Sequence, residues 1–196
     1  MKITKEKSDQ NRAALVSAAS RLFREKGIDG VGVAEISKAA GLTHGALYAH
    51  FPSKEALAVE AMALGVAQAK DKLFEDAVDG APDLDAFLDF YLDPAQRDDY
   101  GGGCALAAAA SEIGRQDTAL GEVATRSFLG SVELFEARLR ARQPDADVRP
   151  QAMALVAAMI GAVAMARATV KSNPEVSAQI LQGTRAMLDG ALRVPA

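Results

Sequence analysis

The sequence predicts an all-α protein of about nine helices. Alanine, the best helix former, accounts for 41 of the 196 residues, whereas valine, isoleucine and threonine together account for 26 and tryptophan is absent. Apolar residues recur at helical spacing, and no stretch shows the sustained alternation of a half-buried strand. A chain of this length buries about 70% of its surface on folding, which suffices for a core without disulfide or metal support.

Composition and charge exclude several classes of protein. With 49% hydrophobic and 24% charged residues the chain is not disordered, and its single cysteine, Cys104, excludes an intramolecular disulfide. The first residues are too polar for a signal peptide and no apolar run reaches the roughly 18 residues of a membrane span, so we expect a cytoplasmic protein. Residues 1–54 hold nine basic and five acidic residues, a net +4, and the remainder thirteen and twenty-one, a net −8. We expect the positive part to meet a polyanion.

The first predicted helix covers about residues 8–26. Leu15, Ala19 and Leu22 recur at i, i+4 and i+7 and form one apolar stripe. Gly27 follows the last charged residues and provides the C-terminal stop. Three glycines within six residues then predict a loop.

Two short helices are predicted next, at 33–40 and 44–50. Thr43 is a suitable N-cap for the second of them. Leu47 and Phe51 are four residues apart, so both point to the same side, which we expect to be the inner one.

A long helix is predicted from Lys54 to about Val78, with Ser53 as its cap. A turn and a shorter helix over 84–92 follow. The stretch 93–103 contains three consecutive glycines and is predicted to be a loop.

The remaining chain predicts four helices, at 104–115, 117–141, 151–171 and 174–193. Residues 152–166 contain no charged or strongly polar side chain, which indicates a helix buried on more than one side. Asn173 and Pro174 form an N-cap followed by proline at the first helical position, a clear helix start.

The two short helices have the arrangement of a helix-turn-helix, in which the second helix enters the major groove of DNA. Gly41 supplies a turn residue without a Cβ penalty. His44 and Tyr48 share the face opposite the buried side, and the small Gly45 and Ala46 allow close approach to base edges. Phosphate contacts are expected from residues at the ends of the segment, which are Thr43, His50 and Lys54.

The segment VAEISKAAGLTHGALYAHFPSKEAL, residues 33–57, is similar to the DNA-binding signature of the tetracycline-repressor (TetR) family of bacterial transcriptional regulators. The resemblance extends from about Ala13 to Leu57. It implies a homodimer that binds a palindromic operator through two recognition helices, and most such proteins are repressors released by a small molecule. The implied domains are a helix-turn-helix DNA-binding domain, 1–53, and a ligand-binding and dimerisation domain, 54–196.

The resemblance also implies roles for individual residues. We expect His44 to lie near bases, and Thr43, Tyr48, His50 and Lys54 to lie mainly at phosphates. The full DNA-facing set is Thr43, His44, Gly45, Ala46, Tyr48, His50 and Lys54. Two departures from the family pattern, Gly32 in place of a frequent threonine and Ala46 in place of a hydroxyl residue, bear on which operator is recognised.

The C-terminal part is expected to supply a dimer interface and a ligand pocket. The resemblance implies a four-helix interface from helices 151–171 and 174–193 of two subunits, although the same helices could simply fill the core of a monomer. The residues expected to line the pocket, each of which could equally be ordinary core, are Phe87, Tyr91, Phe128, Phe135 and Met159.

Cys104 is a further candidate for the ligand site. It follows a glycine run at a predicted helix N-terminus, a position that favours thiol reactivity. The segment GGGCALAAAASEI resembles one in family members that sense electrophiles through a cysteine. A plain packing role is the alternative, since unpaired cysteine is among the most buried residue types.

Two other functions are weighed against a DNA-binding regulator. An enzyme is disfavoured because the two histidines, His44 and His50, lie about 240° apart around a helix and no nucleophile or nucleotide-binding motif is present. No cofactor or metal is expected. A helical ligand-binding protein without DNA function would differ by lacking steeply salt-dependent DNA binding. The sequence does not identify the effector, the operator or the regulated genes.

Overall fold

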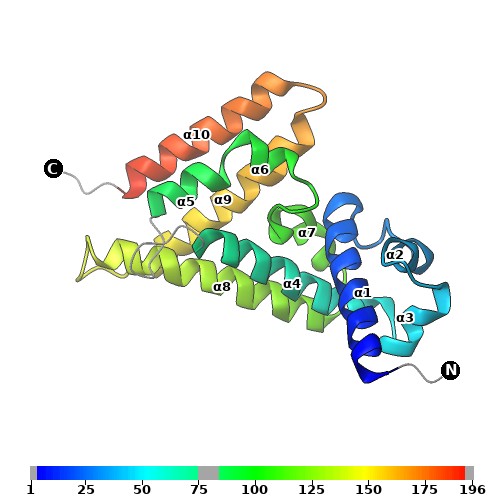
Figure 1. Ribbon diagram of the computed structural model, residues 1–196. Helices are drawn as coiled ribbons and strands as arrows, with labels where there is room; N and C mark the ends of the chain where they lie inside the picture. Colours follow the sequence, from blue (N-terminus) through cyan, green and yellow to red (C-terminus); the bar gives the residue numbers. More distant parts are fainter. Residues whose placement is uncertain (1–3, 75–83, 193–196) are drawn as a thin grey trace. The chain divides into compact units, whose positions relative to one another are not determined.

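The structure is a computed structural model that describes residues 4–74 and 84–192 (Figure 1). Over these ranges it contains ten α-helices and no strand, which confirms the predicted all-α fold. The helices are α1 (Lys5–Lys26), α2 (Val33–Ala39), α3 (His44–His50), α4 (Lys54–Phe74), α5 (Leu84–Tyr91), α6 (Pro94–Asp98), α7 (Ala105–Ile113), α8 (Thr118–Arg140), α9 (Arg149–Thr169) and α10 (Pro174–Leu192). The end expected near Val78 for the helix that begins at Lys54 lies outside the described residues.

The chain forms two compact units. The first consists of residues 1–69 and 100–124, and the second of residues 70–99 and 125–196. Helix α7 therefore belongs to the same unit as α1, α2 and α3, although it follows them by more than fifty residues in sequence. The division between residues 53 and 54, which the family resemblance implies, stays a prediction.

The core of the first unit forms where α1, α2 and α3 pack on one another in pairs. The apolar stripe predicted for α1 is confirmed, since Leu15, Ala19 and Leu22 are all buried. Ile36 from α2 and Leu47 from α3 are fully buried as well. Burial of these side chains is what holds the two short helices, because helices of seven residues are not stable alone.

Helix α6 corrects the prediction of a loop over 93–103. Asp93 is its N-cap and accepts a hydrogen bond from the backbone N–H of Ala95 at 2.7 Å, and Pro94 occupies the first helical position. This is the same signal that correctly predicted the start of α10, where the Asn173 side chain caps the N–H of Val176 at 3.1 Å. The stretch was predicted to be a loop because the three consecutive glycines that follow were given more weight than this capping signal.

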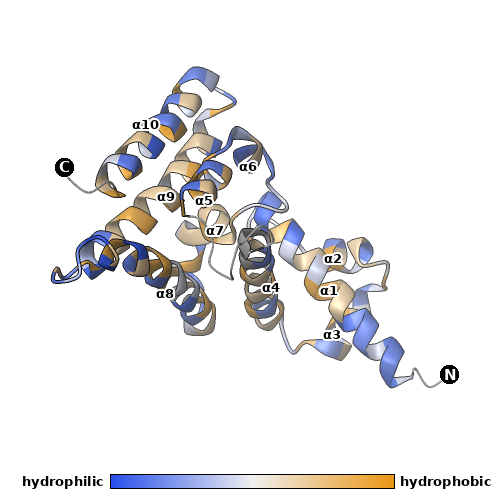
Figure 2. Cartoon of the chain, turned by 60° about the vertical axis from the view of Figure 1, so that its left-hand side comes forward, coloured by the Kyte–Doolittle hydropathy of each residue, from blue (hydrophilic) through white to orange (hydrophobic). Residues whose placement is uncertain are grey.

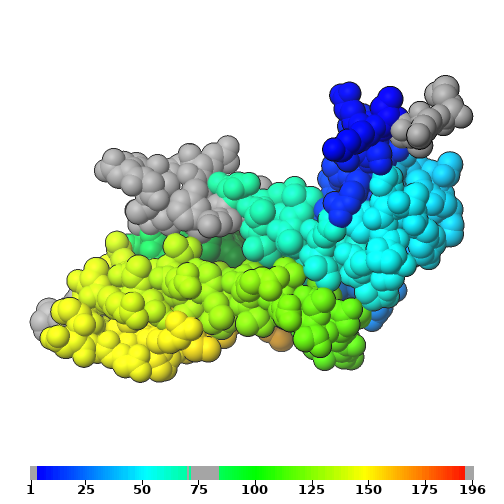
Figure 3. Space-filling view, turned by 90° about the horizontal axis from the view of Figure 1, so that it is seen from below, coloured from blue at the N-terminus to red at the C-terminus, as the bar shows by residue number. Residues whose placement is uncertain are grey.

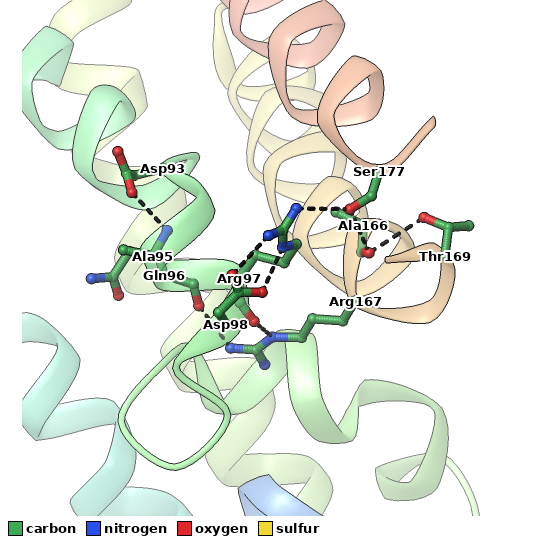
Figure 4. A network of polar contacts seen from close by, with 9 residues as sticks. All are labelled: Asp93, Ala95, Gln96, Arg97, Asp98, Ala166, Arg167, Thr169 and Ser177. Atoms are coloured by element: carbon green, nitrogen blue, oxygen red, sulfur yellow. Dashed lines mark hydrogen bonds and ion pairs between the residues drawn. The ribbon is translucent and has the colours of Figure 1, made fainter. Parts of the chain in front are cut away.

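Within the second unit, α6 is bound to α9 and α10 by two arginines (Figure 4). Arg167 of α9 donates to the backbone carbonyls of Gln96, Arg97 and Asp99, at 2.9–3.0 Å, and so holds the C-terminal end of α6. Arg97 donates to the hydroxyl of the buried Ser177 in α10 at 3.2 Å. Its guanidinium also bonds Asp98, and this hydrogen bond lowers the pKa of the Asp98 carboxyl.

Helix α9 is almost entirely apolar (Figure 2) and packs on α10 and α6. Its 21 residues make it the single helix, among the residues that the structure describes, that is long and apolar enough to cross a membrane. The uncharged run within it, residues 152–166, is shorter than the roughly 18 residues of a membrane span, as expected, because Arg167 closes it. Val156 and Ala166 are fully buried in the second unit, as in the core helix of a folded domain. Met165, by contrast, is 55% exposed, so part of the helix presents an apolar surface.

Candidate DNA-binding interface

The recognition helix α3 is fixed in place by its buried side. Leu47 is 0% exposed, and the following Phe51 is buried as well, as the four-residue spacing predicted. The turn before α3 is closed by Gly41, whose φ of +70° is unfavourable for a residue with a side chain. The backbone N–H of Leu42 then bonds the carbonyl of Ser37 at 2.8 Å, which joins the turn to α2.

The opposite side of α3 carries an aromatic pair that is open to solvent. The ring centroids of His44 and Tyr48 lie 6.1 Å apart with an interplanar angle of 58°, and Tyr48 is 56% exposed. A Cβ atom added at Gly45 would meet nothing within 4 Å. The structure therefore brings His44, Gly45 and Tyr48 together on one exposed face, and the space-filling view shows this part of the chain in cyan at the surface (Figure 3).

The residues expected at phosphates occupy the two ends of α3. Thr43 stands at the N-cap position, but its hydroxyl makes no capping hydrogen bond and the residue is exposed. His50 is half-buried in the last turn, and Lys54 is half-buried at the start of α4. That start is fixed by Ser53, whose hydroxyl accepts from the N–H of Ala56 at 3.2 Å, which confirms the predicted cap.

Two basic residues near α3 were not among the predicted site residues. The guanidinium of Arg12 lies over the ring of Phe51, 4.7 Å from its centroid, and also pairs with Glu60. Arg12 thus links α1, the end of α3 and α4. Lys38 is exposed in the last turn of α2, the helix that crosses the DNA backbone in helix-turn-helix proteins. The sequence offered one signal that could have identified Lys38, namely that it is the one lysine in α2.

The predicted ligand residues are divided between the two units. Phe87 and Tyr91 pack against each other in the second unit with ring centroids 5.6 Å apart. Phe128 lies half-buried in the same unit, where Phe135 and Met159 are fully buried core residues. Cys104 lies in the first unit, so the structure does not bring all six into one site.

The second unit contains a groove of about 480 Å³ between α5 and α10. Its apolar floor includes Leu92 and Leu181, and its rim carries three aspartates and Arg185. None of the six predicted ligand residues lines it. Within residues 4–74 and 84–192, no group of three or more metal-binding side chains lies close enough together to hold a metal ion.

Comparison with known proteins identifies the class. The family model for bacterial regulatory proteins of the tetR family matches residues 15–61, and the model for the C-terminal domain of LmrA/YxaF-like transcriptional regulators matches residues 81–176. The fold and the exposed helix therefore define a helix-turn-helix regulator. The chain belongs to the TetR family of ligand-responsive, DNA-binding transcriptional regulators, whose members bind DNA operators and act as dimers.

Individual relatives agree with this assignment. The regulator LmrA of Bacillus subtilis is 28% identical over 169 residues, which are 84% of this chain and 90% of LmrA. The regulator AcrR of Shigella flexneri is 41% identical over 54 residues, which are 28% of this chain and only 25% of AcrR. The crystal structure of reduced Escherichia coli NemR has the same fold, with a TM-score of 0.74, 22% identity and coverage of 95% and 98% of the two chains.

Because the space around Gly45 is open, we expect Gly45→Ala to stabilise the protein but to weaken its binding to DNA. Replacing a helical glycine by alanine raises the free energy of unfolding by a few tenths to about 1 kcal/mol. If α3 lies against base edges, however, the added methyl group of Gly45→Ala occupies the space of the DNA. We expect urea denaturation to show a more stable protein, and titration of labelled operator to show about tenfold weaker binding.

Gly130→Ala is the matched control for this prediction. Gly130 lies in α8 and also has nothing within 4 Å of an added Cβ. Its substitution should raise stability without changing the affinity for DNA. Unchanged DNA binding by Gly45→Ala would contradict the placement of this face of α3 against bases.

Proposed function

We propose that the protein is a homodimeric repressor that binds a two-fold symmetric operator through α3 and is released from it by a small molecule. The observation that carries the proposal is the exposed His44 and Tyr48 face on a helix whose other side is locked by Leu47 and Phe51. This arrangement suits a helix that enters the major groove. The family membership of the chain supports the same reading.

In the proposed complex, bases and phosphates are contacted by different residues. His44, in the first turn of α3, lies where helix-turn-helix proteins contact base edges. Phosphates are contacted by the residues that border this position, which are Thr43, Tyr48, His50 and Lys54. The exposed Lys38 is added to the phosphate set.

His44→Ala and Lys54→Gln should weaken DNA binding in different ways. Loss of a base contact costs about 1–3 kcal/mol on the cognate sequence and leaves non-specific binding unchanged. Loss of a phosphate contact weakens binding to all sequences and lowers the slope of log K against log salt by about one. Fluorescence anisotropy with the duplex that flanks the gene, and with a random duplex, measures both quantities. If both variants bind DNA as the wild type does, the proposal that α3 contacts DNA is wrong.

The proposed dimer interface is the exposed side of α9 together with α10. Within the described residues, Met153 and Met165 of α9 and Val176 and Met187 of α10 are large apolar side chains left exposed. Their presence on the two helices that pack most extensively on each other fits a four-helix interface between subunits.

Met165→Glu should therefore break the dimer. Placing an unpaired carboxylate in an apolar interface should raise the dimer dissociation constant at least about tenfold. Sedimentation velocity measures the change, and Phe90→Glu, which places the same charge on an exposed apolar site in α5, is the control. An unchanged dimer in Met165→Glu, or equal dissociation in both variants, would contradict this interface.

The effector site is proposed to lie among Phe87, Tyr91, Phe128, Phe135 and Met159 of the second unit. Their apolar and aromatic side chains suit a hydrophobic small molecule. The groove between α5 and α10 is a second place in that unit where a ligand could reach apolar surface.

Thiol-based sensing through Cys104 is a second candidate function. Cys104 is the N-cap of α7, and its Sγ accepts a hydrogen bond from the N–H of Ala107 at 3.5 Å. The sulfur therefore lies at the N-terminus of α7, and the residue is half-buried. The solved structure of NemR, which is similar to this chain in fold, is that of a reduced form.

Modification of Cys104 tests this candidate. If the protein senses electrophiles, N-ethylmaleimide should lower operator affinity by at least about tenfold, because a group larger than the capping thiol displaces the start of α7. Cys104→Ser, which keeps a capping side chain, should bind the operator and no longer respond to the reagent. A modified wild-type protein with full affinity would leave Cys104 a packing role.

A further inference from the structure

Helix α7 lies in the C-terminal part of the sequence but contacts the DNA-binding part of the structure. Residues 81–176 match the C-terminal family model, and α7 falls inside that range. In the structure α7 nevertheless packs on α1, within the unit that contains the helix-turn-helix. Helix α7 is therefore part of the structural support of the helix-turn-helix.

The contact at the C-terminal end of α7 is made by Glu112. Its two carboxylate oxygens accept the backbone N–H groups of Ile28 at 2.9 Å and Asp29 at 3.2 Å, in the loop between α1 and α2. Gly27 has a φ of +82°, and a Cβ atom there would lie 2.8 Å from a carboxylate oxygen of Glu112. Gln116 adds a hydrogen bond of 3.1 Å to the Asp29 side chain. The carboxylate thus fits against the bare backbone of this loop.

The other end of α7 is tied to the same helix α1. Arg24 is 9% exposed and donates to the carbonyl of Gly103, directly before α7, at 3.3 Å. The same guanidinium bonds the carbonyl of Ser20 at 3.0 Å and the side chain of Gln68 at 3.2 Å. Helix α7 is therefore attached at both ends to the last turns of α1 and the loop that follows.

The loop held by Glu112 leaves little freedom to the helices beyond it. Ile28 and Val31 are buried, and a Cβ atom at Gly30 would lie 2.2 Å from the carbonyl of Lys26. Lys26 also pairs with Glu35 of α2 at 2.5 Å. Because α2 packs on α3, this loop is connected to the recognition helix through α2.

We propose that Glu112 is a positioning residue for operator binding. It fixes the loop between α1 and α2 and, through the packing of α2 on α3, the position of α3. The inference rests on the proposed function.

The variant Glu112→Gln distinguishes a role of Glu112 in positioning the loop from a general effect of its negative charge on DNA affinity. Removing a negative charge from a DNA-binding protein should by itself leave affinity for DNA unchanged or raise it. Loss of the carboxylate that holds two N–H groups should instead lower operator affinity about fivefold to tenfold, the factor that corresponds to a hydrogen bond of ordinary net strength. Affinity for random duplex, which depends on charge, should not fall.

Glu133→Gln, at an exposed position of α8, is the charge-matched control. Fluorescence anisotropy of both variants against the flanking duplex and a random duplex gives the comparison. A fall in operator affinity for Glu112→Gln alone supports the proposal. Operator affinity equal to that of Glu133→Gln, or higher, overturns it.

A second variant covers the case in which Glu112→Gln does not fold. Glu112→Asp keeps the charge but is one methylene shorter, so it cannot hold both N–H groups, and it must show the same fall in operator affinity. If the wild-type protein binds no DNA, the proposed function fails. In that case amide hydrogen exchange is compared between the wild type and whichever Glu112 variant folds. Faster exchange in the variant at Ile28, at Asp29 and throughout α2 supports the inference. Faster exchange at Ile28 and Asp29 alone overturns it.

Discussion

The burial of Leu47 is the constraint on which the DNA-binding part of this protein depends. Helix α3 has seven residues, too few to be stable in isolation, and its first turn has no side-chain cap. Its position is therefore set by tertiary contacts, chiefly the fully buried Leu47 and the buried Phe51. The same contacts decide which face is exposed, because fixing one side of a short helix leaves His44 and Tyr48 on the other.

The surrounding helices extend this constraint through a small number of contacts with defined geometry. Arg12 lies over the Phe51 ring, so the end of α3 is held from α1. Glu112 and Arg24 attach α7 to the other end of α1 through hydrogen bonds between their side chains and backbone groups; the Arg24 bond is buried and the bond from Ile28 to Glu112 is partly buried. Exposed ion pairs such as that of Lys26 and Glu35 contribute little energy by comparison. A helix from the C-terminal part of the sequence thus becomes part of the support for the recognition helix.

The sequence predicted those features that depend on neighbouring residues. The turn at Gly41, the buried spacing of Leu47 and Phe51 and the cap at Ser53 are local signals, and the structure confirms them. Helix α6 was missed because a capping signal at Asp93 competed with a glycine run in the same stretch. The contact between Glu112 and Ile28 joins residues 84 positions apart, and no periodicity within either segment records it.

For the residues expected to bind a ligand, too, the sequence predicted less than the whole arrangement. Phe135 and Met159 are fully buried, which fits either of the two roles weighed for them, pocket lining or ordinary core. Apolar periodicity could not predict whether a pocket lies beside them, because a cavity depends on how several helices fail to fill space. The roles of Thr43, His50 and Lys54 at DNA likewise depend on a partner molecule and stay predictions.

Hydroxyl-radical footprinting of the DNA that flanks the gene tests the central claim most directly. A dimer that presents two copies of α3 should protect two half-sites related by two-fold symmetry, with centres one helical turn of about 34 Å apart or a multiple of it. Excess random duplex should leave this protection in place. Protection of a single stretch without symmetry, or none that survives the competitor, would contradict the account of α3 as the element that reads an operator.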